Sequence, residues 1–194
     1  MQLYRALLAA ADNAGEKVIL VGDSSGGNII LSLTLEALRE DQEKVEEIGG
    51  TLRGSPRPYP TALMVISPST DLRRTNTTIK TIEPLDPFLT PTFITSTARA
   101  WSGDWDPYDS KLSPLQADVS LLTKVGVKVH GIIGGYDILS PDAVKFRDKC
   151  AQEGVYGRWL EWDKQMHCFI LTWSYGIPEA NEAVSWMIDV LKYE

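Results

Sequence analysis

Hydrophobic and polar positions along this 194-residue chain follow two alternating patterns. Short runs that are apolar throughout, several of them rich in β-branched residues, indicate strands covered on both faces of a parallel sheet. Longer stretches with apolar residues three and four positions apart indicate amphipathic helices. The predicted strands are residues 18–21, 62–66, 127–133 and 158–162, and the predicted helices are residues 3–13, 28–42, 141–153 and 178–192.

This alternation of strands and helices predicts an α/β fold, with a mostly parallel sheet and helices on both of its faces. Turn and cap residues set the expected boundaries of the helices. Gly15 is expected to end the first helix, and Ser140 is expected to cap the helix that has Pro141 in its first turn. In such sheets, functional residues lie just past the carboxyl ends of the strands.

Two segments fall outside the alternation. Residues 43–60 are charged and then rich in Gly and Pro, which is typical of a loop. Residues 73–116 are rich in Thr, Pro and aromatic residues, with a short helix near 90–101. We interpret residues 1–194 as one catalytic domain in which residues 73–116 form a lid or insert. The aromatic residues of this insert are expected either to line a substrate pocket or to pack a small subsidiary core; they are Phe88, Phe93, Trp101, Trp105 and Tyr108.

Composition excludes several classes of protein. The chain has 26 acidic and 19 basic residues, a net charge of −7, and no basic cluster, which argues against nucleic-acid binding and an anionic-membrane anchor. The two cysteines, Cys150 and Cys168, are too few for a disulfide scaffold or a four-thiolate metal site, and we expect free thiols. No apolar run is long enough to span a bilayer, and no secretory signal is visible. The compartment stays open, with the cytoplasm slightly favoured.

A glycine-flanked serine follows the first predicted strand. Ser24 is the centre of a G-x-S-x-G turn between a buried strand and an amphipathic helix, within the run Gly22-Asp23-Ser24-Ser25-Gly26-Gly27-Asn28. The glycines let strand and helix approach closely, while the serine takes a strained backbone conformation that projects its hydroxyl above the sheet. The N–H of Ser25, at the start of the helix, is placed to donate to a developing oxyanion. There are two alternatives: the turn has no chemical role, or Ser25 is the nucleophile.

A serine nucleophile needs a base within hydrogen-bond reach, and the chain has two histidines. His130 lies inside the third predicted strand, which favours a packed side chain. His167 lies in the loop after the fourth predicted strand, at the same edge of the sheet as Ser24. We therefore expect His167 to be the base, and a surface histidine of no catalytic role is the alternative.

The base must in turn be oriented by an acceptor. Asp137 follows the third predicted strand and is the candidate. Asp142 competes with it, but an acid in the first turn of a helix is explained by the helix dipole alone. The resulting order along the chain is Ser24, Asp137, His167, which is the order of the triad in α/β-hydrolases.

Four motifs resemble the hormone-sensitive-lipase-like branch of the α/β-hydrolases. They are the elbow Gly22–Asn28, which is similar to G-D-S-[AS]-G-G-N; Gly135–Leu139, similar to the acid turn G-x-D-x-L; Met166–Phe169, similar to the H-x-F base loop; and Ser113–Asp118, similar to S-P-L-x-A-D. The resemblance implies a partial α/β-hydrolase fold and hydrolysis of short- to medium-chain carboxylic esters. It implies neither a metal nor an organic cofactor.

The sequence departs from that family at the oxyanion loop. The family carries an H-G-G-[GA] loop upstream of the elbow, but no His-Gly-Gly occurs in this chain, and only 23 residues precede Ser24. The chain thus resembles the carboxyl-terminal portion of such an enzyme, without its first strands and cap. Ser25 would then be the remaining oxyanion donor, and loss of one donor costs about 10² to 10³ in turnover.

The same departure leaves one strand edge bare. In the family's strand order the absent strands would pair with the strand from Val18 to Val21, so we expect a second polypeptide or a symmetry mate to cover this edge. The leading hypothesis is a serine carboxylesterase. The alternatives are a non-catalytic ligand-binding or interaction protein on a truncated hydrolase fold, and an inert fragment.

Overall fold

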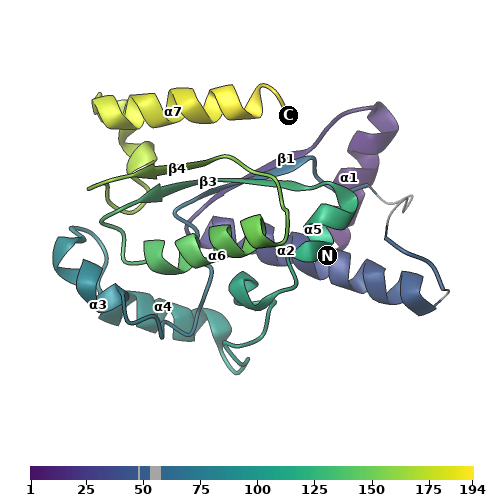
Figure 1. Cartoon of the computed structure of the whole chain (residues 1–194), viewed down its shortest axis with the longest axis horizontal. Coiled ribbons are helices and arrows are strands. Elements are labelled where there is room, and N and C mark those ends of the chain that lie inside the picture. The colour runs from purple at the N-terminus through teal and green to yellow at the C-terminus, as the bar shows by residue number, and fades with distance from the viewer. Residues whose placement is uncertain (48, 53–57) are drawn as a thin grey trace.

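The computed structural model describes residues 1–47, 49–52 and 58–194, which form an α/β fold (Figure 1). In chain order the elements are α1 (Gln2–Ala14), β1 (Ile19–Asp23), α2 (Ser25–Glu47), β2 (Ala62–Ile66), α3 (Ile79–Ile82), the 3₁₀ turn η1 (Glu83–Leu85), α4 (Pro91–Ser102), η2 (Pro114–Gln116), α5 (Ser120–Val125), β3 (Lys128–Gly134), α6 (Ser140–Gln152), β4 (Trp159–Trp162), η3 (Phe169–Tyr175) and α7 (Pro178–Leu191).

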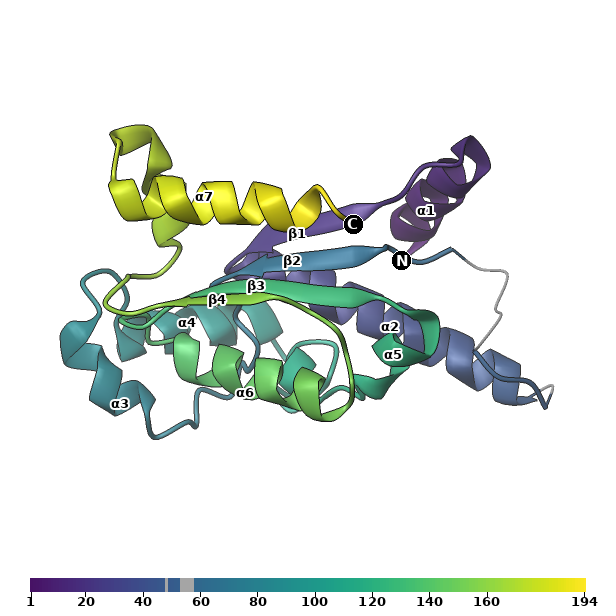
Figure 2. The ribbon, with the colours of Figure 1, turned by 45° about the horizontal axis from the view of Figure 1, so that its top comes forward.

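Four strands form one parallel sheet in the order β1-β2-β3-β4. Helices α1 and α7 lie on one face, and α2 and α6 lie on the other (Figure 2). The predicted fold class is therefore confirmed. Because all strands run the same way, their carboxyl ends share one edge of the sheet, toward which the arrowheads of β3 and β4 point in Figure 1.

Alternate residues of the central strands enter two different hydrophobic cores. Leu63 and Val65 of β2 pack with side chains of α2, α5 and α6. Met64 and Ile66 pack with Ile132 and with side chains of η3 and α7. Every residue of β2 is buried, as expected for a strand covered on both faces.

Helix α2 is longer than predicted at both ends, and the prediction of a loop from residue 43 is wrong for residues 43–47. Side-chain pairs one helical turn apart support the charged end: Arg39 pairs with Glu36 and Glu43, and Gln42 donates to Glu46. Within the rest of the predicted loop, residues 48 and 53–57 lie outside the described part of the chain.

Helix boundaries differ in their agreement with the sequence. Gly15 ends α1 in the left-handed conformation with φ 69°, as predicted. Ser140 is the first residue of α6 and not its cap; Leu139 holds the cap position, without a side-chain hydrogen bond. Thr90 caps α4, where its Oγ1 accepts a hydrogen bond of 3.2 Å from the N–H of Phe93.

Strand β1 is an edge strand of the described sheet. It pairs with β2, and Val21 is 50% exposed although β2 beside it is buried throughout. An apolar, half-exposed edge presents free N–H and C=O groups, so it is a site at which a further strand could pair.

Candidate active site

Ser24 lies at the sharp turn between β1 and α2, with the strained backbone that the motif predicts. Its φ is 49°, in the left-handed region that few residues other than glycine adopt. Three backbone hydrogen bonds fix the turn. The N–H of Ser24 donates to Ile66 O at 2.8 Å, and its carbonyl accepts from the N–H groups of Ser69 at 3.1 Å and Asn28 at 3.2 Å. The hydroxyl is thereby held at the carboxyl edge of the sheet.

The two outer glycines of the G-x-S-x-G motif serve different purposes. A Cβ on Gly22 would lie 2.4 Å from the carbonyl oxygen of Gly26, so only glycine fits where the strand meets the first turn of α2. A Cβ on Gly26 would meet nothing within 4 Å. Close approach thus requires Gly22, whereas Gly26 contributes only its backbone to that contact.

The structure brings together the three side chains that sequence reasoning selected. His167 Nε2 lies 2.9 Å from Ser24 Oγ, and its Nδ1 lies 2.8 Å from Asp137 Oδ2. Asp137 is completely buried and His167 is 7% exposed. Each residue follows a different strand, namely β1, β3 and β4.

Backbone contacts fix the turn of Asp137 against the loop of His167. Gly135 N–H donates to Trp162 O at 2.8 Å, and Tyr136 N–H donates to Gln165 O at 2.9 Å. The other carboxylate oxygen of Asp137 accepts the N–H of Leu139 at 2.8 Å. The acid and the base are therefore oriented by one continuous set of contacts.

The surroundings of His167 change its basicity in opposite directions. Burial alone lowers the pKa of the imidazole, but the hydrogen bond to Asp137, the contact with Cys168 and the Asp137 charge together raise the pKa above its usual 6.5. Asp137 therefore favours the imidazolium that forms when His167 accepts a proton.

Sequence reasoning did not single out Ser67, which anchors the loop of His167. Its Oγ accepts a hydrogen bond of 3.0 Å from the N–H of Cys168, and its own N–H donates to Ile132 O at 2.8 Å. Ser67 directly follows β2 and has a φ of 44°. Its position past the carboxyl end of a central strand was the available signal.

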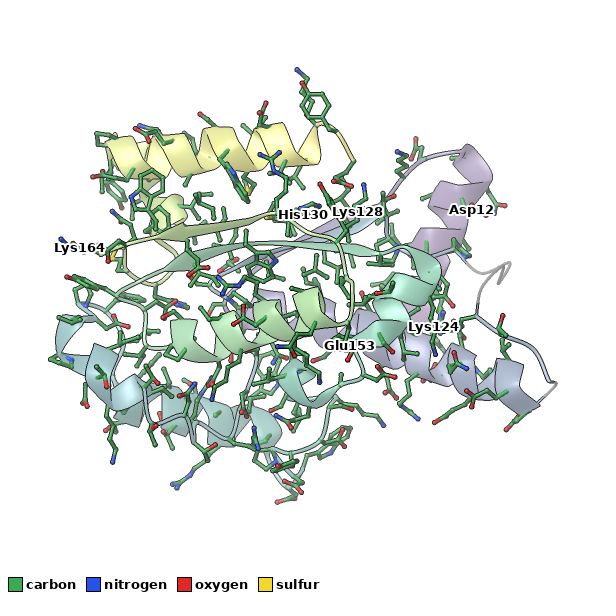
Figure 3. All side chains as sticks on the ribbon, viewed as in Figure 1. Asp12, Lys124, Lys128, His130, Glu153 and Lys164 are labelled. Atoms are coloured by element: carbon green, nitrogen blue, oxygen red, sulfur yellow. The ribbon has the colours of Figure 1, made fainter. Side chains whose placement is uncertain are left out.

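His130 and Asp142, the other candidates for the base and the acid, make contacts with other residues. His130 is buried in β3, where its Nδ1 accepts the N–H of Arg158 at 3.0 Å. In Figure 3, His130 lies near the middle of the molecule, whereas Lys164, which belongs to the loop of His167, lies at its left end. Asp142, in the first turn of α6, accepts a hydrogen bond from Asn76 at 2.7 Å.

Ser25 begins α2, beside Ser24. Its backbone N–H belongs to the first turn, whose N–H groups have no acceptor within the helix. The imidazole of His167 contacts the hydroxyl of Ser24, and within the described ranges no hydrogen bond joins it to the hydroxyl of Ser25. The geometry therefore favours Ser24 over Ser25 as the nucleophile.

A cavity of about 270 Å³ opens beside Ser24 and His167. Most of its wall is apolar and comes from Leu139 and from residues 72–101, including α4. Phe88 stacks on the ring of His167, with centroids 6.3 Å apart and planes 12° apart. Of the aromatic residues considered from the sequence, Phe88, Phe93 and Trp101 line this cavity; Trp105 and Tyr108 instead lie against Lys111 and Arg73.

Further features of the described residues concern metal ligands, disulfides and membrane-spanning helices. Among them, no group of three or more His, Cys, Asp or Glu side chains is arranged to hold a metal ion. Cys150 and Cys168 are free thiols. None of the helices within the described ranges combines the length and apolar character needed to cross a bilayer.

Comparisons with known proteins identify the family of this fold. Residues 1–171 match the family described as alpha/beta hydrolase fold. An esterase from Acinetobacter venetianus is 26% identical over 184 residues, which are 94% of this chain and 54% of that protein. The chain spans about half the length of the curated relatives it matches.

Solved structures show the same architecture. An esterase from the bacterial hormone-sensitive lipase family superposes with a TM-score of 0.73 at 26% identity, over 90% of this chain and 52% of that one. A hormone-sensitive lipase from a metagenome library gives a TM-score of 0.76 at 20% identity, over 95% and 57% of the two chains. Because the family match covers residues 1–171, the chain belongs to the alpha/beta hydrolase fold family, as its resemblance to the hormone-sensitive-lipase-like branch predicts.

Proposed function

We propose that this chain carries the catalytic centre of a serine carboxylesterase. The observation that carries the proposal is the imidazole of His167, which bridges Ser24 Oγ and Asp137 Oδ2 at 2.9 and 2.8 Å. Both contacts are within the range for proton transfer and for orientation of a base.

The proposed reaction has two halves. Ser24 Oγ attacks the ester carbonyl while His167 Nε2 accepts the hydroxyl proton, and the N–H of Ser25 donates to the carbonyl oxygen as it becomes negative. The C–O bond to the alcohol then breaks, His167 returns the proton to the leaving oxygen, and an acyl-Ser24 ester remains. A water molecule then attacks this ester while His167 accepts its proton; the bond from the acyl carbon to Ser24 Oγ breaks, His167 returns the proton to Ser24 Oγ, and the acid is released.

The cavity supports short- to medium-chain acyl substrates. Its volume of about 270 Å³ lies just below the range of about 300–1,000 Å³ that drug-sized ligands occupy. Helix α4 and Phe88 belong to residues 73–116 and form part of its wall, which supports the role of this segment as a lid or insert.

The exposed edge of β1 supports a partner in the active assembly. Val21 is 50% exposed, and the sequence has no His-Gly-Gly run to complete the oxyanion site. We propose that a second polypeptide, or a second copy of this chain, pairs with β1. Light scattering coupled to size-exclusion chromatography tests this, because a stable, soluble monomer of this chain alone would overturn it.

One alternative keeps the fold without the chemistry. It is a non-catalytic ligand-binding or interaction protein, in which the cavity beside Ser24 would hold a ligand without cleaving it. Hydrolysis of p-nitrophenyl acetate and butyrate separates the two functions, measured with and without a polypeptide that carries the H-G-G segment. The esterase proposal expects turnover that requires Ser24; absence of turnover under both conditions would favour the binding protein.

A further inference from the structure

Arg74 lines the cavity that Ser24 and His167 share, and its guanidinium donates to Ser69, which lines the same cavity. Three neutral acceptors hold it: Ser69 Oγ at 2.8 Å, Asp71 O at 2.8 Å and Ile94 O at 3.4 Å. A guanidinium has five N–H donors, so these contacts engage three of them. One donor on each terminal nitrogen stays outside these bonds.

The charge of Arg74 also lacks a direct counter-ion. None of the ion pairs in the described part of the chain involves Arg74, because the carboxylate of Asp71 is held by the neighbouring Arg73 at 2.6 Å. Burial lowers the pKa of the Arg74 guanidinium, and the more distant charges of Asp142, Asp71 and Asp137 oppose this change. An arginine stays protonated even so, and a buried cation is stabilised by a carboxylate that reaches it.

From this juxtaposition we infer that Arg74 determines substrate specificity by binding a carboxylate on the acyl part of the ester. The preferred substrates are then half-esters of short dicarboxylic acids, an inference that rests on the proposed esterase function. The planar guanidinium matches a carboxylate, and the apolar side chains of Leu89, Ile94 and Leu139 in the same cavity suit the methylene chain between carboxylate and ester.

The overall charge of the protein makes this recognition local. A net charge of −7 gives no long-range attraction for an anionic ester, so a preference for one must arise from contact within the cavity. The alternative is that Arg74 acts only as a structural clamp, which ties residues 69–71 to α4 through the same three hydrogen bonds.

Two substrates of the same shape separate these roles. Monoethyl glutarate carries the carboxylate, and ethyl 5-methylhexanoate replaces it with an isopropyl group. We expect the active protein to prefer the half-ester in kcat/KM, and Arg74→Gln to lower kcat/KM for the half-ester by about 10- to 100-fold more than for the neutral ester, the range of hydrogen bonds to charged groups. The matched control is Arg99→Gln, since Arg99 is exposed on α4, lies outside the cavity lining and should leave the ratio unchanged. An equal loss for both esters, or a wild-type preference for the neutral one, would overturn the inference.

A binding measurement keeps the inference testable if Arg74→Gln does not fold. Calorimetric titration of Ser24→Ala, which removes turnover, with each of the two esters should show tighter binding of monoethyl glutarate. Equal or weaker binding of the half-ester overturns the role of Arg74. If the wild-type protein hydrolyses no ester but the half-ester still binds more tightly, the Arg74 site is retained and the esterase function is rejected.

Discussion

The hydroxyl of Ser67 accepts the backbone N–H of Cys168 at 3.0 Å and so joins the end of β2 to the loop that carries His167. Ser67 is 1% exposed, and the contact spans 101 residues of sequence. The end of β2 thereby supports the loop after β4 that carries His167, the proposed base.

Ser67→Ala should remove this support without touching the reacting atoms. We expect a loss of about 1–3 kcal/mol in the free energy of unfolding, because the N–H of Cys168 loses its acceptor, and a fall in kcat. Urea unfolding and ester hydrolysis measure the two effects. Wild-type kcat in a folded Ser67→Ala protein would show that Ser67 does not position His167.

The elbow glycines provide a matched pair of substitutions. Gly22→Ala places a Cβ 2.4 Å from Gly26 O, so we expect a loss of about 1–3 kcal/mol or more in stability and a displaced Ser24. Gly26→Ala meets open space in the first turn of α2 and should cost little, or stabilise the helix by about 0.5–1 kcal/mol. Denaturant midpoints compare the two variants, and equal destabilisation would contradict this account of the turn.

The pH dependence of hydrolysis should report the environment of His167. The base acts in its neutral form, so the rate should fall as pH drops through a pKa that lies above 6.5. Asp137→Asn removes the carboxylate whose hydrogen bond and charge raise this pKa, and it leaves the burial that lowers the pKa. We expect the acid limb of the profile to move to lower pH, together with a loss of about 10⁴ in kcat. A limb that moved to higher pH would contradict the assignment.

The same shift has a consequence for stability. The pKa of His167 is higher in the folded chain than in the unfolded one, so the pair with Asp137 contributes its full stabilisation below about pH 6.5 and loses it as pH rises through the folded pKa. Unfolding free energies of the wild type and of Asp137→Asn, measured across this range, should therefore converge as pH rises. A difference that widened with pH would show that the pair is not coupled in this way.

Local patterns were sufficient to predict the sheet and the three convergent side chains. The strand at residues 62–66 is apolar throughout and coincides with β2. Ser24, Asp137 and His167 each follow a strand, and parallel strands bring their carboxyl ends to one edge.

Sequence patterns did not predict the roles of Ser67 and Arg74, because these roles depend on contacts between segments that are distant in the sequence. The hydroxyl of Ser67 accepts a hydrogen bond from Cys168, 101 residues away in the sequence. Arg74 lines the cavity, where its guanidinium is held by acceptors in residues 69–71 and in α4. The extension of α2 to Glu47 rests on side-chain pairs such as Arg39 with Glu43, whose charges gave the segment the composition of a loop.

The central claim is that His167 activates the hydroxyl of Ser24. The most direct test is intact-mass measurement and peptide mapping after reaction with a fluorophosphonate, on the chain in its active assembly. The account predicts one adduct per chain, located on Ser24, absent in Ser24→Ala, retained in Ser185→Ala as the matched control, and formed far more slowly in His167→Ala. An adduct on Ser25, or undiminished labelling of Ser24→Ala, would contradict it.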